Sequence, residues 1–252
     1  MKTFPREIGN KSQNESPKAI VHLEAVSKVY GMRDIEVKAL NGVSLTVEPG
    51  EYCSIMGASG SGKSTAMNII GCLDRPSSGS YQLDGVGVAQ MNEGELAKIR
   101  NLKIGFVFQQ FHLLSQMTAL DNVMLPMLYA GISAKERRER ATEALIRVGL
   151  ENRMHNKPNQ LSGGQQQRVA VARALVTNPK LILADEPTGN LDSKNGEEVM
   201  TMLRELNNEG TTIVMVTHSE KEGGYADRLV RLLDGQIMVD KSNVIAGQIG
   251  AA

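Results

Sequence analysis

The sequence predicts an α/β fold built on a mostly parallel sheet. Short apolar stretches alternate along the chain with longer stretches of helical spacing, as in strand–helix–strand units. A glycine-rich loop at 57–65 joins one such strand, 52–56, to a helix over 66–73. Polar residues follow where four apolar strands end, at Gly57, Gln109, Asp185 and His218. Because ligands bind beyond the carboxyl ends of strands in such sheets, these four positions indicate one site.

The N-terminal part predicts a different kind of sheet. Residues 1–19 are polar and have no apolar period, so we expect a disordered tail there. From residue 20 apolar and polar residues alternate as far as Tyr30, and they alternate again over 43–47. This alternation predicts a small antiparallel sheet ahead of the parallel core. By periodicity alone, Tyr30 only pads that sheet.

The middle of the chain changes from mixed to helical character. The elements expected first are a turn at 76–79, a strand at 81–85, a helix at 92–102 and a strand at 104–108. A helical insert subdomain then follows at about 111–165. Within it, Ser133 and Glu136 have capping-box spacing and open a helix that ends at Gly149. The charged run 135–140 is either a solvated helix face or a binding patch.

The last third returns to the strand–helix alternation. The expected elements are a helix at 166–176, a strand at 181–184, a helix at 192–208, a strand at 212–216 and a hairpin of 229–233 and 237–239 across Asp234-Gly235. Residues 241–252 are weakly patterned and predict a loose tail. We therefore expect one domain at 20–240, in which about 20–110 and 166–240 form the antiparallel and parallel parts.

The composition excludes several classes of function. The 28 basic and 28 acidic residues cancel and there is no Trp, so neither charge nor base stacking favours nucleic acid. Two cysteines, Cys53 in a strand and Cys72 in a helix, indicate neither a disulfide framework nor a metal site. The chain shows no secretory signal and no stretch of about 18 apolar residues that could span a bilayer. We expect a soluble, cytosolic chain that reaches a membrane only through a partner.

The glycine-rich loop indicates a phosphate-binding site. Residues 57–65 match G-x-x-x-x-G-K-[ST] at every fixed position, between a strand and a helix. Backbone N–H groups of the loop and the helix N-terminus would hold an anion. Lys63 would reach the β- and γ-phosphates of a nucleotide, and Ser64 would ligate Mg²⁺. The alternative is a Gly/Ser loop with a chance lysine.

Three further strand ends complete a site for phosphoryl transfer. Asp185 follows four apolar residues, so we expect it to hold Mg²⁺ mostly through water, and Glu186 to polarise the attacking water. The alternative for each carboxylate is an N-cap or a surface turn. His218 either contacts the γ-phosphate or is a satisfied core histidine. Gln109 either simply ends its strand or reports the phosphate state to the helical insert.

The stretch 161–165, Leu-Ser-Gly-Gly-Gln, predicts a second anion site. Two glycines expose backbone N–H groups ahead of a helix. One nucleotide has no need of two separate phosphate sites from one chain. A symmetric head-to-tail dimer resolves this, because each ATP then lies between residues 57–65 of one subunit and residues 161–165 of the other.

With these motifs in order, the chain resembles the ATPases of ABC transporters from about Ile20 to Asp240. The matching motifs are Walker A (57–65), the Q-loop (Gln109), the signature (161–165), Walker B with its glutamate (181–186), the D-loop (190–192) and the switch histidine (His218). The resemblance implies a P-loop NTPase core of the RecA-like type, with an N-terminal antiparallel β subdomain and an α-helical insert.

The resemblance also implies roles for individual residues. It implies that Tyr30 stacks on adenine, in place of the padding role that periodicity suggests. The implied Mg²⁺ ligands are Ser64, Gln109 and Asp185, and the implied catalytic residues are Lys63, Gln109, Glu186 and His218. The residues implied in ATP binding are Tyr30, Gly57, Ala58, Ser59, Gly60, Ser61, Gly62, Lys63, Ser64, Thr65, Ser162, Gly163, Gly164, Gln165 and Asp192.

Within that superfamily the chain is similar to the macrolide-exporter and lipoprotein-release group, through 71–74, 105–114, 161–168 and 184–193. This likeness implies that ATP-driven dimerisation powers a membrane permease with four membrane helices and a large extracytoplasmic domain. A periplasmic adaptor is a further implied partner. The chain would then lie peripherally on the cytoplasmic face of the inner membrane. We expect the permease to be a separate polypeptide, unless the sequence was cut from a longer one.

An alternative is an ABC ATPase that regulates a membrane signalling partner without transport, as in cell division, since its motifs would be the same. DNA-repair and translation ATPases would need a coiled-coil insertion or a second cassette, and this sequence has neither. The chain departs from the family pattern in two places. Ser219 follows the switch histidine where Asp or Glu is usual, and Gly223-Gly224 stands where a helix is common.

Overall fold

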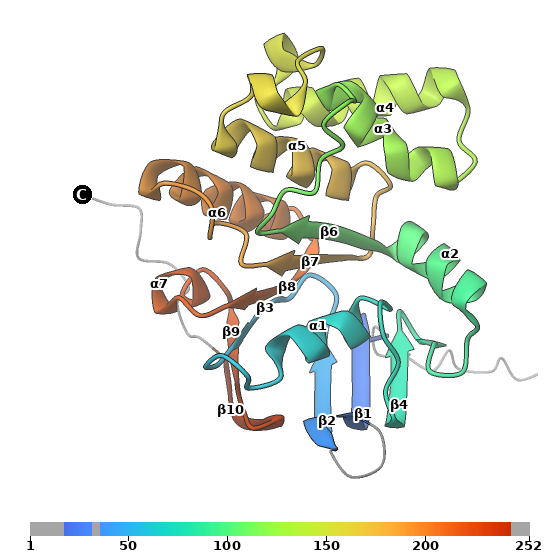
Figure 1. Cartoon of the computed structure of the whole chain (residues 1–252), viewed down its shortest axis with the longest axis vertical. Coiled ribbons are helices and arrows are strands. Elements are labelled where there is room, and N and C mark those ends of the chain that lie inside the picture. Colours follow the sequence, from blue (N-terminus) through green and yellow to red (C-terminus); the bar gives the residue numbers. More distant parts are fainter. Residues whose placement is uncertain (1–17, 32–35, 243–252) are drawn as a thin grey trace, which may run out of the picture.

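A computed structural model describes residues 18–31 and 36–242. Two β-sheets lie one below the other in Figure 1, with α1 between them and a layer of helices above the upper sheet. Most of the predicted N-terminal and C-terminal tails, at 1–17 and 243–252, lies outside the described residues.

The lower sheet is the predicted antiparallel one, in the strand order β2-β1-β4-β5. Its strands are β1 (Val21–Tyr30), β2 (Val37–Val47), β4 (Ser78–Leu83) and β5 (Val86–Gly87). The register places Val47 and Leu83 on either side of Val21, so three apolar residues meet on the buried face. The strand β2 begins at Val37, six residues before the alternation that predicted it.

The upper sheet has the order β10-β9-β3-β8-β7-β6. Its strands are β3 (Tyr52–Met56), β6 (Ile104–Phe108), β7 (Leu181–Asp185), β8 (Thr212–Thr217), β9 (Arg228–Leu233) and β10 (Gln236–Ser242). All pairs are parallel except the β9–β10 hairpin, which confirms the predicted parallel core. Strand β10 runs to Ser242 opposite Arg228, so residues 241 and 242 are strand and not part of a loose tail.

The register of the parallel strands brings their carboxyl ends to one edge of the sheet. Met56 pairs with Thr217, and Phe108 pairs with Asp185. Because strands β3, β8, β7 and β6 end together, the residues that follow them lie on the same side of the molecule.

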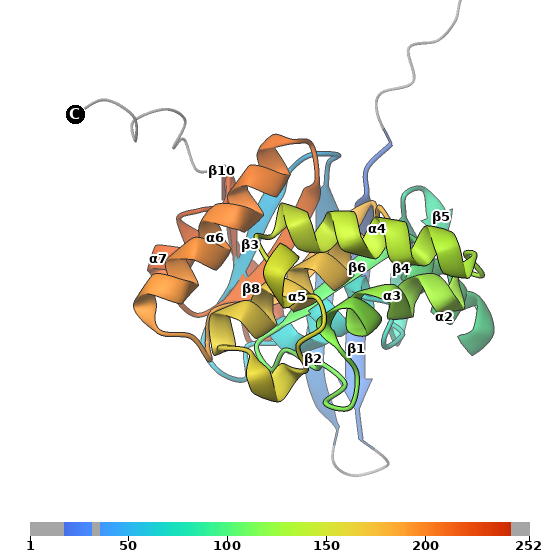
Figure 2. The ribbon, with the colours of Figure 1, turned by 90° about the horizontal axis from the view of Figure 1, so that it is seen from above.

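The helices begin at side-chain caps in most cases. Their bounds are α1 (Lys63–Ile70), α2 (Glu93–Lys103), α3 (Ala119–Tyr129), α4 (Ala134–Arg147), α5 (Gly163–Leu175), α6 (Ser193–Asn208) and α7 (Glu220–Gly223), with 3₁₀ turns at Glu151–Arg153 and Pro158–Gln160. Seen from above, α3 and α4 lie side by side over α5 and the sheet (Figure 2).

Three sequence expectations about helices are corrected. Residues 111–118 are not helical, because the buried Asn122 side chain binds the backbone of Leu114, Met117 and Thr118. Helix α5 begins at Gly163, so the signature forms its first turn and does not precede it. Cys72 lies beyond α1 with a positive φ of 53°, which no continuing helix adopts.

The apolar core occupies both faces of the upper sheet. Successive strand residues point to opposite faces, so Leu183 packs toward α1 and the lower sheet while Ile182 packs toward α5 and α6. Both side chains are fully buried. The upper sheet is therefore a rigid layer between two cores, and the edge where its strands end stays open to solvent.

The buried side-chain amide of Asn207 connects the loops before β3 and β8. Asn207 is 6% exposed, and its Nδ2 donates to the carbonyls of Gly50 (2.8 Å) and Thr211 (3.0 Å). We expect Asn207→Ala to lower the free energy of unfolding by about 2–3 kcal/mol, because two buried carbonyls lose their donor. Its exposed neighbour, Asn208→Ala, is the matched control and should change stability by less than about 0.5 kcal/mol. Urea unfolding measures both, and equal effects would contradict this role of Asn207.

Candidate functional site

The loop between β3 and α1 is shaped by its glycines. A Cβ on Gly57 would collide with the Leu232 carbonyl oxygen. Gly62 has a φ of 102°, and a Cβ there would lie 2.5 Å from the Ala39 carbonyl oxygen. Strand β2 and the β9–β10 hairpin therefore press on the loop, and side chains at these two positions would displace it. The first N–H groups of α1 have no acceptor within the helix, so this end of the loop suits an anion.

Lys63 is the buried cation of this loop. It is 9% exposed, and its Nζ donates to the carbonyls of Gly57 (2.8 Å) and Ala58 (2.9 Å). The ammonium group therefore lies across the loop and faces a cavity of about 650 Å³. The predicted site residues that line this cavity are Ser59, Gly60, Gly62, Lys63, Ser64, Thr65, Asp185, Glu186 and His218.

Two adjacent carboxylates enter the cavity from the end of β7. Burial raises the pKa of Asp185, the neighbouring Glu186 raises that pKa further, and Lys63 opposes both effects. Glu186 has a positive φ of 42°, and its N–H donates to the Val216 carbonyl (2.9 Å). The turn places the Glu186 side chain on the cavity, where it contacts His218.

His218 lies beside Glu186, with Nδ1 2.8 Å from Glu186 Oε1. Its side chain is 70% exposed, which excludes the alternative of a satisfied core histidine. The end of β8 thus presents an imidazole to the same cavity as Asp185 and Glu186.

Gln109 follows β6 but its side chain turns toward the D-loop. Its Nε2 lies 3.5 Å from Asn190 Oδ1, and Asn190 Nδ2 donates to the Gln109 carbonyl (3.0 Å). A Cβ on Gly189 would lie 2.6 Å from Gln109 Nε2. Gln109 is not among the described residues that line the cavity, so the structure brings it to the edge of the site and not into it.

Tyr30 lies close to the first turn of α1, where it forms a hydrogen bond with Thr65, but it is not among the described residues that line the cavity. Its hydroxyl donates to Asp74 Oδ2 (2.7 Å), and the Lys28 ammonium lies 4.9 Å from its ring centroid. Burial raises the pKa of Tyr30, as does the bond to Asp74, while a hydrogen bond with Thr65 lowers it. Lys28 also binds Asp74 at 2.6 Å. Sequence reasoning missed that Lys28 and Asp74 hold this ring, since Asp74 lies 44 residues beyond Tyr30 in the chain.

The signature lies apart from the cavity of its own chain. Ser162 and Gln165 cap α5 reciprocally, through Gln165 N to Ser162 Oγ (3.3 Å) and Ser162 N to Gln165 Oε1 (3.0 Å). A Cβ on Gly164 would collide with Asn195, whose Nδ2 donates to Asp192 Oδ2 (2.6 Å). The signature and the D-loop are thus neighbours. Among the described residues, none from 162 to 165, nor Asp192, lines the cavity.

Sequence reasoning also missed a hydrogen-bonded bridge, in which the Glu222 carboxylate joins Thr188 and Thr217. Thr217 Oγ1 donates to Glu222 Oε2 (2.5 Å), and Thr188 Oγ1 donates to the other oxygen of the same carboxylate. Ser219, the first departure from the family pattern, accepts the N–H of Glu222 and caps α7. The helix therefore forms in spite of Gly223-Gly224, but it ends after one turn.

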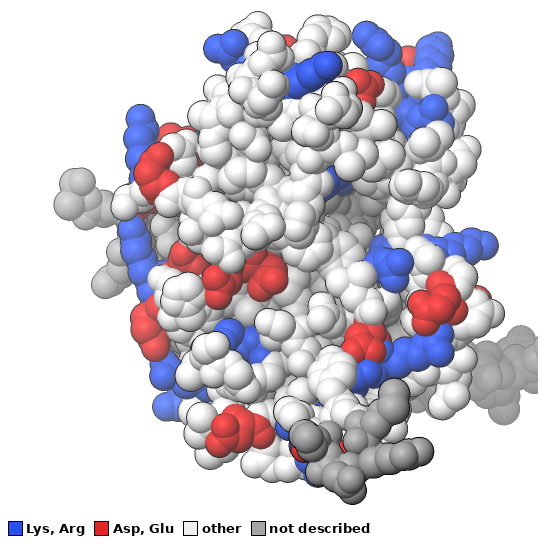
Figure 3. Space-filling model, in the orientation of Figure 1, with Lys and Arg blue, Asp and Glu red and all other residues white. Residues whose placement is uncertain are grey.

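The molecular surface, seen in the orientation of Figure 1, shows two further features. In Figure 3, acidic side chains gather on the left at the height of the upper sheet, and the surface is hollowed between the upper helical layer and α2. No helix in the described part of the chain combines the length and apolar character that a bilayer crossing requires.

The geometry agrees with the comparisons to known proteins. A family profile described as "ABC transporter" matches residues 40–189. An uncharacterized ABC transporter ATP-binding protein, YvrO of Bacillus subtilis, is 54% identical over 89% of this chain and 98% of its own length. The macrolide export ATP-binding/permease protein MacB of Escherichia coli is 50% identical over 91% of this chain, which spans 35% of that protein.

Solved structures agree with this assignment. The dimeric structure of the ATP-binding cassette MJ0796, bound to ADP and Pi, has a TM-score of 0.81 and 49% sequence identity. The match covers 88% of this chain and 98% of that one. The predicted fold, a P-loop NTPase core with an antiparallel β subdomain and a helical insert, is confirmed. The chain belongs to the ABC transporter family, as one of its ATP-hydrolysing cassettes.

Proposed function

We propose that two copies of this chain enclose two ATP molecules and hydrolyse them to drive a membrane permease. The observation that carries the proposal is the separation of the two anion sites. Lys63 and Ser64 line the cavity, whereas the exposed Ser162 and the half-buried Gly163, at the start of α5, lie outside it. A second copy, rotated by a two-fold axis, would supply the missing half. The dimeric MJ0796 structure, at 49% identity, supports this arrangement.

The cavity also suits Mg²⁺. Ser64 and Asp185 both line it and offer the hard oxygen donors that this ion prefers. No group of three His, Cys, Asp or Glu side chains among the described residues could hold a metal by itself. That is the arrangement expected for an ion that takes its remaining ligands from phosphates and water. Bound Mg²⁺ would neutralise charge on the β- and γ-phosphates, and Gln109 would join its ligands by leaving Asn190.

The remaining roles follow from position. Glu186 would polarise the attacking water, and His218 would orient its carboxylate and contact the γ-phosphate. Tyr30 would present to adenine the ring face that Lys28 leaves open, since 41% of the residue is exposed. Residues 57–65 would bind the phosphates of one ATP, and residues 162–165 with Asp192 would complete the site from the second copy.

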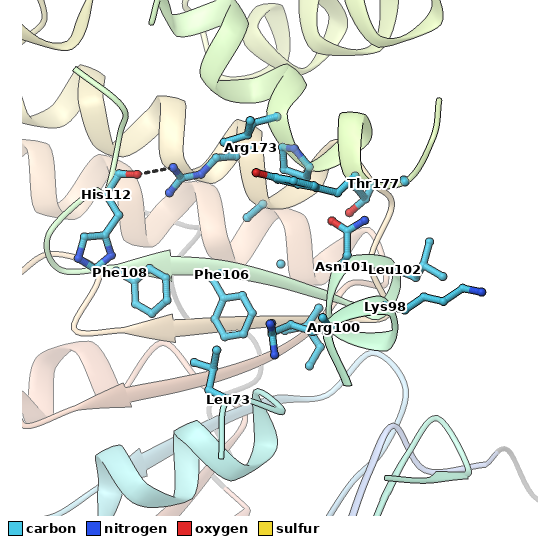
Figure 4. A pocket seen from close by; sticks show the side chains of 18 residues that line it. Leu73, Lys98, Arg100, Asn101, Leu102, Phe106, Phe108, His112, Arg173 and Thr177 are labelled. Atoms are coloured by element: carbon cyan, nitrogen blue, oxygen red, sulfur yellow. Dashed lines mark hydrogen bonds between the residues drawn. The ribbon is translucent and has the colours of Figure 1, made fainter. Parts of the chain in front are cut away.

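The permease would dock in the hollow between the upper layer of helices and α2. A largely apolar groove of about 750 Å³ lies there (Figure 4). Phe106 and Phe108 of β6 point into it. Tyr129 of α3 also lines it and is 75% exposed. Such a groove fits one amphipathic helix of a partner. Because Gln109 directly follows Phe108, a partner seated here would sense movement of Gln109.

The class of permease is suggested by the relatives. Proteins named macrolide export ATP-binding/permease proteins carry a closely similar cassette. We therefore favour an export-type or lipoprotein-release-type permease with a periplasmic adaptor, which holds this chain at the cytoplasmic face of the inner membrane. The second candidate, a cell-division type regulator of a membrane signalling partner, shares the same cassette and would use the same groove.

Removal of the loop cation tests the phosphate site. We expect Lys63→Ala to weaken ATP binding at least tenfold, because the β- and γ-phosphates lose their charged donor. Calorimetric titration with Mg²⁺-ATP measures the change in Kd. Lys221→Ala removes an exposed lysine elsewhere and should bind ATP as the wild type does. Unchanged affinity in Lys63→Ala would exclude residues 57–65 as the phosphate site.

Removal of the candidate base tests the dimer. Glu186→Gln should bind ATP, lose about 10²–10³-fold in kcat, and accumulate as a closed dimer because hydrolysis no longer reopens it. Size-exclusion chromatography with light scattering, with and without Mg²⁺-ATP, measures the mass. A Glu186→Gln chain that stays monomeric at saturating ATP would contradict the shared site.

A charge in the groove tests the docking surface. Tyr129→Glu should abolish copurification with a co-expressed permease of the macrolide-export type, while Kd for ATP stays unchanged, since a carboxylate would be buried against an apolar partner. Ile146→Glu places the same charge on α4, at an apolar residue that is 53% exposed and outside the groove, and should leave the complex intact. Retention of the permease by Tyr129→Glu would move the docking site elsewhere.

A further inference from the structure

The carboxylate of Glu222 joins the ends of two strands that carry candidate catalytic residues. Thr217 is the last residue of β8, is fully buried, and directly precedes His218. Thr188 lies two residues after Glu186, in the turn beyond β7. One oxygen of Glu222 accepts from each threonine hydroxyl, at 2.5 Å from Thr217.

The position of Glu222 is set by the one-turn helix α7. Ser219 N donates to Thr217 Oγ1 (3.0 Å), and Ser219 Oγ accepts from Glu222 N (3.3 Å). A Cβ on Gly223 would lie 2.5 Å from Met56 Sδ, so the helix packs closely against the end of β3. The carboxylate is thereby directed back over the sheet edge and not into solvent.

The bonding pattern suits an ionised carboxylate. Such a group only accepts hydrogen bonds, and each threonine offers one hydroxyl donor. Hydrogen bonds to a charged acceptor are stronger than neutral ones, and the half-buried setting limits competition from water. A continuous bridge therefore joins the ends of β7 and β8, and it is formed by Thr188, Glu222 and Thr217.

We propose that Glu222 is a positioning residue that holds Glu186 and His218 in register for hydrolysis. The proposal rests on the catalytic roles inferred above for these two residues. Glu222 is not among the described residues that line the cavity, so it would act through the residues it contacts. Glu186 has a positive φ and needs support from its surroundings. That support comes from its turn, where Gly189 N donates to the Glu186 carbonyl (3.0 Å) and Thr188 binds Glu222.

If the bridge positions the catalytic groups, its loss should lower kcat and leave ATP binding unchanged. Loss of the carboxylate would leave residues 57–65 intact, so ATP binding should be unaffected. It would remove the side-chain bridge between the turn after Glu186 and the end of β8, and leave the Glu186 N–H bond to Val216 as a backbone hydrogen bond between that turn and β8. A small displacement of catalytic groups lowers the chemical rate strongly. A role confined to stability would lower the melting temperature and leave kcat of the folded enzyme unchanged.

Steady-state ATPase kinetics of the purified full chain test this. Glu222→Ala and Thr188→Val should each lower kcat by about tenfold with KM for ATP within about twofold of wild type. Thr188→Ser keeps the hydroxyl and should retain wild-type kcat. The double variant Glu222→Ala/Thr188→Val should be no slower than Glu222→Ala alone, because both changes cut the same bridge. Glu220→Ala removes an exposed carboxylate of the same helix and is the control that should keep full activity.

The outcomes separate this role from the proposed function. If Glu186→Gln is inactive but Glu222→Ala and Thr188→Val keep wild-type kcat, the positioning role is wrong and the site stands. If Glu186→Gln keeps wild-type kcat, the site itself is wrong. Should Glu222→Ala fail to fold, the pair Thr188→Val and Thr188→Ser decides alone, and equal kcat values in that pair overturn the proposal.

Discussion

The parallel pairing of β3, β8, β7 and β6 determines where the polar residues that follow these strands lie. Because these strands end in register, with Met56 opposite Thr217 and Phe108 opposite Asp185, residues from four distant segments meet at one sheet edge. The two apolar cores on either face hold the strands in this register. Slippage of one strand would turn its buried residues to the opposite face, so the site inherits the rigidity of the core.

That same edge holds only one of the two proposed phosphate-binding stretches. Residues 57–65 face the cavity, whereas the signature lies at the start of α5, packed through Gly164 on Asn195 of α6. The two half-sites are separated within the chain because they belong to different layers of the fold. Under the proposed function, a nucleotide that binds both would join two copies, and association would depend on ATP.

Short polar contacts connect the catalytic edge to the rest of the molecule. Gln109 is bonded to Asn190, and Glu222 is bonded to Thr188 and Thr217. These contacts link the ends of β6, β7 and β8, each of which carries a different part of the site. The apolar groove begins at Phe106 and Phe108 of the same strand that ends at Gln109. A change at the phosphates thus has a short structural route to the groove.

Local patterns in the sequence determined the fold class, the strands of the parallel core and the phosphate-binding loop, since hydrophobic period and glycine spacing act over a few residues. Only the tertiary structure decided that residues 111–118 are not helical, that Gln109 turns to Asn190, and that Lys28 and Asp74 hold Tyr30. It also decided the bridge through Glu222. Each of these features depends on hydrogen bonds formed once packing has placed the partners, and most join residues far apart in the chain. A one-dimensional pattern does not contain those distances.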